Sequence, residues 1–258
     1  MTTPQYKGSA HLRRLWEAGE PAFGLWRMLT DPITTELCAA TDFDYSVLDL
    51  QHGFGSLADL PVTLQAARAG GHQPLVRTPW RDSWMIMRAI DAGAAGVIVP
   101  MINSPQEAAE AVAACKFPPA GARSWGPMWA DVREDAAPLP NIANARVTCV
   151  VMVETQDGVD ALDEIVAVPG VDAVYIGPND LALSCGFGRD TYDTNPDVDE
   201  LIQGIVDTCN EAGVRAGVHC SSPEMALDWA ERGASMLTAT ADTTLLKDGA
   251  TAALAQLR

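Results

Sequence analysis

One stretch of the sequence decides the fold: residues 148–180, which read TCVVMVETQDGVDALDEIVAVPGVDAVYIGPND. It holds two runs rich in apolar and β-branched residues, 148–155 and 172–178, of the kind found in strands buried on both faces. A segment with apolar residues three and four apart lies between them, which is typical of a helix. A strand, a helix and a second strand in this order predict a parallel βαβ unit.

The same alternation extends along most of the chain. Further strand-like runs lie at 22–29, 45–50, 73–79, 96–102, 215–220 and 235–240, and clear helical patterns lie at 57–70, 82–93, 104–116 and 197–213. Eight such units in about 250 residues fit a closed (β/α)8 barrel. An open doubly wound sheet is the alternative, but no G-x-G-x-x-G follows the first strand. We predict a single α/β TIM-barrel domain over residues 1–258, with an extra N-terminal helix and a long loop, 117–145, between strands four and five.

Composition excludes several classes of function. The net charge is −17 and no cluster of Lys and Arg is present, which argues against nucleic-acid binding. No run is long and apolar enough to cross a membrane, and the N-terminus has no apolar core of the signal-peptide type. The six cysteines show neither C-x-x-C nor zinc-site spacing, so we expect reduced thiols in a cytoplasmic protein.

Polar residues stand at the ends of four predicted strands. His52 follows the second strand, Arg77 lies in the third, Glu154 ends the fifth, and Asp180 lies just past the sixth. Singly, each has an ordinary explanation, as a loop-bonded histidine, a salt-bridge partner or a helix cap. Active sites of TIM barrels lie at the carboxyl ends of the strands, so four such residues on one rim favour a site.

Glu154 and Asp180 suit a metal ion. They are 26 residues apart, or one βα unit, so they come from adjacent strands. Two carboxylates favour a hard divalent ion such as Mg²⁺, Mn²⁺ or Co²⁺ and leave positions for a chelating 2-oxo acid. Acting as a Lewis acid, the ion would polarise the ketone and stabilise the enolate formed when a C3 proton leaves.

The other strand-end residues suit the rest of such a reaction. Arg77 would stabilise charge on the enolate oxygen, and backbone N–H groups of the turn Gly177-Pro178-Asn179-Asp180 would hold the substrate carboxylate. His52, oriented by Asp49, would move a proton to or from an aldehyde or hydroxyl oxygen. No lysine ends a predicted strand, so a Schiff-base mechanism lacks its nucleophile.

Together these motifs resemble the HpcH/HpaI aldolase family, the metal-dependent class II pyruvate aldolases, over roughly residues 20–250. The resemblance is carried by FDYSVLDLQHGFGSL, QPLVRTPWRD, DAGAAGVIVPMINSPQEAAEAVAACKFPPAGARS, VMVET, VDAVYIGPNDLALSCG and ADTTLL. It implies cleavage of 4-hydroxy-2-oxo acids to pyruvate or hydroxypyruvate and an aldehyde. It also implies a divalent metal on Glu154 and Asp180, the arginine Arg77, the pair His52 and Asp49, and a hexamer built from dimers with swapped helices.

Some positions depart from the family or extend the site. Gln51 stands where relatives commonly carry glutamate, and His219 stands where they often carry an apolar residue. His219 would contact the aldehyde or only fill space. Trp26 and Ser124 are expected to line the mouth, with core packing as the alternative. Asp91 matches an aspartate that reaches a neighbouring subunit's site in relatives, or is simply a helix-end residue.

Three functions stay open on the sequence. The first is the aldolase. The second is another metal–enolate reaction on the same scaffold, such as oxaloacetate decarboxylation or C–C bond formation of the macrophomate-synthase kind, which Gln51 and His219 leave possible. The third is a non-catalytic barrel that binds a 2-oxo acid; the intact set of His52, Arg77, Glu154 and Asp180 argues against it.

Overall fold

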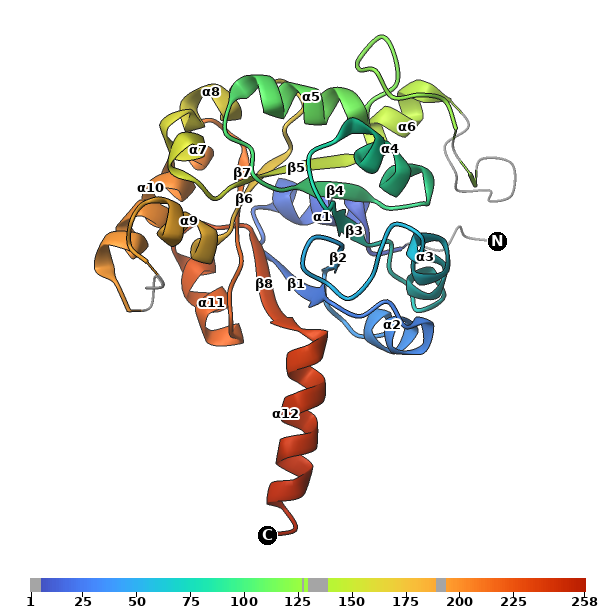
Figure 1. Cartoon of the computed structure of the whole chain (residues 1–258), viewed down its shortest axis with the longest axis vertical. Coiled ribbons are helices and arrows are strands. Elements are labelled where there is room, and N and C mark those ends of the chain that lie inside the picture. Colours follow the sequence, from blue (N-terminus) through green and yellow to red (C-terminus); the bar gives the residue numbers. More distant parts are fainter. Residues whose placement is uncertain (1–5, 127, 130–138, 189–193) are drawn as a thin grey trace.

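The computed structural model describes residues 6–126, 128–129, 139–188 and 194–258. Eight strands pair in parallel, each with the next in the chain, and β8 pairs with β1 to close a barrel. The predicted α/β barrel is therefore confirmed (Figure 1). The strands are β1 (Ala22–Arg27), β2 (Tyr45–Asp49), β3 (Leu75–Arg77), β4 (Gly96–Val99), β5 (Thr148–Val153), β6 (Ala173–Ile176), β7 (Arg215–Val218) and β8 (Met236–Ala241).

Helices follow the strands and surround the barrel (Figure 1). They are α1 (Ser9–Ala18), α2 (Pro32–Ala39), α3 (Leu60–Ala69), α4 (Ser83–Asp91), α5 (Pro105–Cys115), α6 (Pro140–Arg146), α7 (Gln156–Asp160), α8 (Leu162–Val166), α9 (Pro178–Ser184), α10 (Pro196–Glu211), α11 (Pro223–Glu231) and α12 (Asp242–Ala255). Several begin with a capping side chain followed directly by proline: Asp31, Ser104 and Ser222 each accept hydrogen bonds from the first turn of the helix that follows. Helix α6 lies at the end of the predicted long loop, of which residues 127 and 130–138 fall outside the described residues.

The interior of the barrel is filled by alternate side chains of the strands. On β5, for example, Val150 and Met152 belong to the interior cluster, and on β6 Ala173 and Tyr175 do. Because successive side chains of a strand point to opposite faces, this alternation fixes which later residues also point inward. The predicted N-terminal helix α1 contributes Leu12 to the same cluster.

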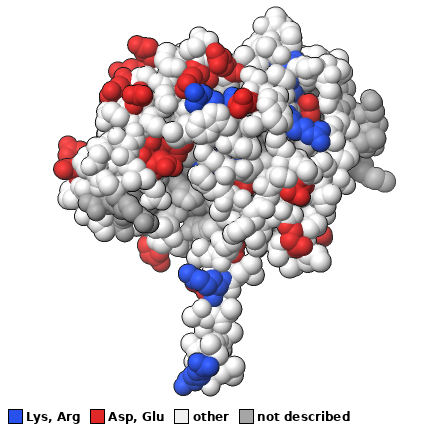
Figure 2. All heavy atoms as spheres, viewed as in Figure 1, with Lys and Arg blue, Asp and Glu red and all other residues white. Residues whose placement is uncertain are grey.

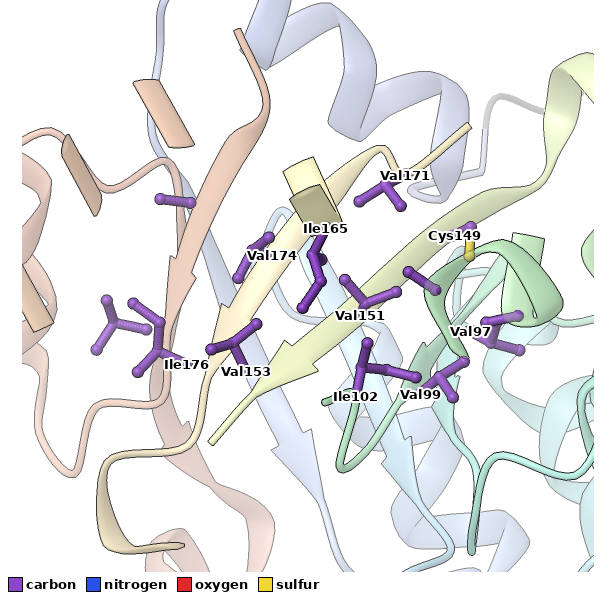
Figure 3. Close-up of a cluster of buried hydrophobic side chains, with 14 of the residues drawn as sticks. Val97, Val99, Ile102, Cys149, Val151, Val153, Ile165, Val171, Val174 and Ile176 are labelled. Atoms are coloured by element: carbon purple, nitrogen blue, oxygen red, sulfur yellow. The ribbon is translucent and has the colours of Figure 1, made fainter. Parts of the chain in front are cut away.

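The other face of each strand packs against the helices. Figure 3 shows part of this layer around β4, β5, β6 and α8, where Val97, Val151, Val174 and Ile165 belong to one continuous cluster. All four side chains are fully buried. The strands are thus apolar on both faces, which is why they read as continuous apolar runs rather than as alternating ones.

The last helix departs from the ring of helices. Helix α12 projects away from the barrel (Figure 1), and Asp242 at its start is its one buried residue. The Asp242 carboxylate accepts the backbone N–H groups of Met28 and Leu29, which ties the start of α12 to the end of β1. In Figure 2, acidic side chains are scattered over the barrel, whereas the visible side chains of the projecting helix include basic ones. Within the described part of the chain, no helix has both the length and the apolar character needed to span a bilayer.

Candidate active site

The inward alternation of the strands ends in a layer of polar residues. Asp49 and Arg77 are the last residues of β2 and β3, while Glu154, Gly177 and His219 directly follow β5, β6 and β7. Glu154 continues the inward set of Val150 and Met152, and Gly177 continues that of Ala173 and Tyr175. The candidate site is thus the top layer of the barrel filling, at the carboxyl ends of the strands.

A cavity of about 120 Å³ opens in this layer. It is lined by His52, Arg77, Met152, Glu154, Gly177, Pro178, Asn179, Asp180 and His219. Eight of these nine residues were predicted as site residues from the sequence, and the structure brings them together. Met152 was not; its position two residues before Glu154 on the inward face is the signal that identifies it.

Arg77 is held in one orientation by Asp49. Its Nε and Nη2 groups donate to the two carboxylate oxygens of Asp49 at 2.9 and 2.5 Å, and its guanidinium lies 5.0 Å from the centre of the Trp26 ring. Asp49 is fully buried; burial alone would raise its pKa, but the bonds and charge of Arg77 lower the pKa below its usual value. The two-pronged contact leaves Nη1 of Arg77 without a hydrogen-bond acceptor among the described residues.

Asp49 has a different partner from the one expected. Its carboxylate accepts the backbone N–H groups of Gln51 and His52 and the indole N–H of Trp26, in addition to Arg77. Within the described residues, no hydrogen bond joins Asp49 to the imidazole of His52. The structure therefore makes Asp49 a support for Arg77, and His52 is exposed at the mouth of the cavity.

Glu154 is buried, and one of its carboxylate oxygens accepts a hydrogen bond. Its Oε1 accepts the backbone N–H of Met101 at 2.9 Å, and Met101 adopts a left-handed backbone conformation with φ of 56°. Burial raises the pKa of Glu154 to about 7; the Met101 N–H opposes this rise, and the negative charge of Asp180 adds to it. Met101 was not predicted, because a backbone donor leaves no mark on the residue type.

The residues of the cavity fit a divalent metal ion. Glu154 and Asp180 line the same cavity, and the charge of Asp180 acts on Glu154. The second oxygen of Glu154, Oε2, has no hydrogen-bond donor among the described residues. A side chain at Gly177 would collide with it, because a Cβ there would lie 2.4 Å away. In the described ranges no cluster of three or more His, Cys, Asp or Glu is arranged to hold a metal ion. The candidate ligands are the two carboxylates that line this cavity.

The remaining predicted residues lie around the cavity rather than in its lining. Trp26 is buried beneath it, in contact with Arg77 and His219. Gln51 is half-buried, Ser124 is exposed, and neither lines the cavity. Asp91 pairs with the buried side chain of Arg123 at 2.5 Å.

Comparison with known proteins shows the family of the chain. The family model HpcH/HpaI aldolase/citrate lyase matches residues 22–248. The chain is 34% identical to a hydroxypyruvate/pyruvate aldolase of Rhizorhabdus wittichii, over 96% of this chain and 98% of that protein. It is also 34% identical to a 4-hydroxy-2-oxo-heptane-1,7-dioate aldolase of Salmonella paratyphi A, over 93% of this chain and 91% of that protein.

A solved structure agrees with these relatives. The crystal structure of an HpcH/HpaI aldolase/citrate lyase family protein from Burkholderia cenocepacia J2315 superimposes with a TM-score of 0.87. The two chains are 32% identical, and the match covers 97% of this chain and 99% of that one. The resemblance predicted from the sequence motifs is confirmed, and with it the expectation of an aldolase. This chain belongs to the HpcH/HpaI aldolase/citrate lyase family.

Proposed function

We propose that the protein is a metal-dependent aldolase that reversibly cleaves 4-hydroxy-2-oxo acids into pyruvate or hydroxypyruvate and an aldehyde. The observation that carries this proposal is one cavity in which two carboxylates, an oriented arginine and an exposed histidine meet. Glu154 and Asp180 would hold the ion, for which Mg²⁺, Mn²⁺ and Co²⁺ are the candidates. When bound, such an ion acts as a Lewis acid toward the ketone of the 2-oxo acid.

Arg77 supplies a fixed positive charge at the reacting oxygen. Its Nη1 group is the part of the guanidinium that Asp49 leaves uncommitted, so it can donate to the oxygen on which negative charge develops as the C3 proton leaves. Orientation by Asp49 and Trp26 removes the need to reorganise this group during the reaction. At the opposite wall, the turn from Gly177 to Asp180 begins α9, whose first backbone N–H groups have no partner within the helix and can bind the substrate carboxylate.

The general experiment is a screen of both half-reactions. Metal-stripped protein would be reloaded with each of the three ions. Exchange of the C3 protons of pyruvate and hydroxypyruvate with solvent deuterium would then be followed by NMR, and addition to a panel of aldehydes by product analysis. Ion-dependent exchange together with addition supports the aldolase. Exchange with no addition to any aldehyde would contradict it.

His52 is placed to handle the aldehyde oxygen. Its ring lies at the exposed mouth, where the second substrate must enter, so it can exchange a proton with the C4 oxygen and with solvent. His52→Ala should lower the rate of aldol cleavage by about 10²-fold or more, the scale of one acid–base group. Proton exchange at C3 of pyruvate and the affinity for the ion should change much less.

The control for this variant is His11→Ala, which removes a histidine of α1 and should leave cleavage at the wild-type rate. Loss of ion binding in His52→Ala would make His52 a metal ligand instead. Undiminished cleavage would leave the imidazole with no part in proton transfer.

We also propose that the protein assembles into a homo-oligomer, a hexamer of swapped dimers, through α12. Helices α2 and α11 of the ring also carry exposed apolar side chains. The exposed side chains are Leu245, Leu246 and Leu254 on α12, Ile33 and Leu37 on α2, and Leu227 on α11. An isolated helix of 14 residues is marginal in water, so α12 needs a partner surface, and a second copy offers one.

A charge on α12 should therefore break the assembly. Leu246→Lys should shift the particle mass toward that of one 27.4 kDa chain, as measured by analytical ultracentrifugation. The control Gln256→Lys adds the same charge beyond the helix and should keep the wild-type mass. A wild-type protein that sediments as a single chain would contradict the proposal.

A further inference from the structure

The floor of the cavity contains an imidazole that the reaction described above does not use. The backbone N–H of His219 donates to Ile176 O at 3.2 Å, which extends the β6–β7 pairing and fixes the residue beside the start of the Gly177 turn. Its ring lies edge-on to Trp26, with the centroids 4.7 Å apart and the planes at 81°. The centroid of the Tyr175 ring is 6.4 Å away. Aromatic neighbours therefore hold the ring in one place.

The imidazole ring of His219 is neutral and makes no hydrogen bond within the described residues. Neither of its nitrogens has a hydrogen-bond partner among the described residues, although the ring lines the cavity with Arg77 and Glu154. Burial, with a smaller contribution from the charge of Arg77, lowers the pKa of His219 to about 4 against the opposing charge of Asp49, so the imidazole is uncharged near neutral pH. A neutral imidazole presents one N–H donor and one lone-pair acceptor. The group that matches both is a hydroxyl, which can accept from one nitrogen or donate to the other.

The depth of His219 indicates which substrate carries that hydroxyl. Buried Trp26 and Tyr175 lie beneath the ring, whereas exposed His52 marks the mouth. In the proposed reaction the 2-oxo acid lies deepest, because its ketone has to reach the ion that Glu154 and Asp180 would hold and its carboxylate has to reach the turn at Gly177. The aldehyde then occupies the part of the cavity near the mouth. A substituent on C3 of the 2-oxo acid is therefore the part of either substrate that can lie against the floor.

We propose that His219 selects the nucleophilic substrate by hydrogen-bonding a hydroxyl group on C3 of the bound 2-oxo acid. The enzyme then prefers a 3-hydroxy-2-oxo acid of the hydroxypyruvate type over pyruvate. This inference rests on the proposed aldolase function and adds to it a specificity-determining residue. The physical reason is that the half-buried imidazole loses its contact with water when the ligand fills the cavity and is left unpaired if that ligand lacks the hydroxyl, so the analogue without it is disfavoured.

The test compares the two donors on three forms of the full chain loaded with Mn²⁺: wild type, His219→Leu and His219→Gln. With one aldehyde acceptor, the ratio of kcat/KM for hydroxypyruvate to that for pyruvate should fall by about tenfold in His219→Leu, the scale of one hydrogen bond lost in a ligand-filled cavity. His219→Gln should recover part of the ratio, since an amide also donates and accepts. Calorimetry without aldehyde should show the same change in the ratio of the two binding constants.

Met152→Leu is the matched control, because it alters the shape of the same floor without a hydrogen-bonding group; it should keep the wild-type donor ratio. Equal losses for both donors in His219→Leu would overturn the inference and leave the ring as a space-filling residue. A changed preference among aldehydes with an unchanged donor ratio would also overturn it. If wild-type protein turns over neither donor, the proposed aldolase function fails, and the ratio of calorimetric binding constants decides the role of His219 separately.

Discussion

Replacing Glu154 with glutamine should abolish the metal-dependent reaction. The amide keeps the size of the side chain and can still accept the Met101 N–H, but it is a much weaker ligand for a hard divalent ion than a carboxylate. We expect turnover to fall by about 10³-fold or more, since the ion contributes several kcal/mol to such reactions. Chelator-stripped wild-type protein should be equally inactive and should recover on addition of Mn²⁺, whereas Glu154→Gln should not.

The same variant should weaken the pH dependence of metal binding. In the metal-free protein burial raises the pKa of Glu154 to about 7, so below pH 7 the carboxyl group holds a proton that the ion must displace. Wild-type affinity for Mn²⁺, measured by calorimetry, should therefore fall roughly tenfold per pH unit below pH 7 and level off above it. The slope should be smaller in Glu154→Gln, whose side chain has no proton to release.

Glu164→Gln provides the matched control, since Glu164 is an exposed carboxylate of α8 in the same βα unit. It should bind Mn²⁺ and turn over substrate as the wild type does. Full activity in excess chelator would exclude the two-carboxylate site. Trapping of the substrate by borohydride would replace it with an imine on a lysine.

Arg77→Ala should slow the first chemical step rather than only the aldol step. Loss of one donor to a developing oxyanion costs about 10²- to 10³-fold, so exchange of pyruvate methyl protons with solvent deuterium should slow by that factor. Arg77→Lys should restore little, because an ammonium group cannot make the two-pronged contact with Asp49. Normal exchange in Arg77→Ala would leave Arg77 with a structural role alone.

Asp49→Asn distinguishes the two roles that have been considered for Asp49. If it supports Arg77, this variant should slow proton exchange as Arg77→Ala does, to a smaller extent. If it instead acted through His52, exchange would be normal and only aldol cleavage would slow. The melting temperatures of Asp49→Asn and Arg77→Ala should be measured as well. Both should be lower than that of the wild type, because removing one partner of a buried ion pair costs about 3–5 kcal/mol of stability. Arg81→Ala, which removes a half-exposed partner of Glu107, is the control and should alter neither measurement much.

The fold could be predicted from the sequence because the strands are buried on both faces and the helices carry strong end signals. All eight predicted strands are present, within a few residues at their ends. The strand predicted over 96–102 ends at Val99, since Met101 turns into the left-handed region to donate its N–H to Glu154. Such a backbone contact depends on two distant segments meeting, and the residue type does not record it.

The sequence predicts which residues form the site, but not which of their side chains contact one another. On each strand, alternate side chains point into the barrel, and the last of these is a polar residue on four strands: Asp49, Arg77, Glu154 and His219. Their meeting at one rim therefore follows from the barrel. Which side chain Asp49 would contact does not follow, because Arg77 on the next strand and His52 three residues later are both within reach by sequence. Ser124, in the long loop, was expected at the mouth and is exposed away from the lining. Loop positions have no periodicity from which their direction can be predicted.

The alternation of inward and outward side chains has a consequence for insertions and deletions. Removing one residue from within β5 would turn Glu154 from the cavity toward the surrounding helices, and would exchange the interior and helix-facing sets of that strand along the way. Removing one residue between a helix and the next strand changes only the length of a connection. Length variants of this enzyme that keep activity should therefore carry their changes in the connections, while the eight strands tolerate replacement of residues but no change in their number.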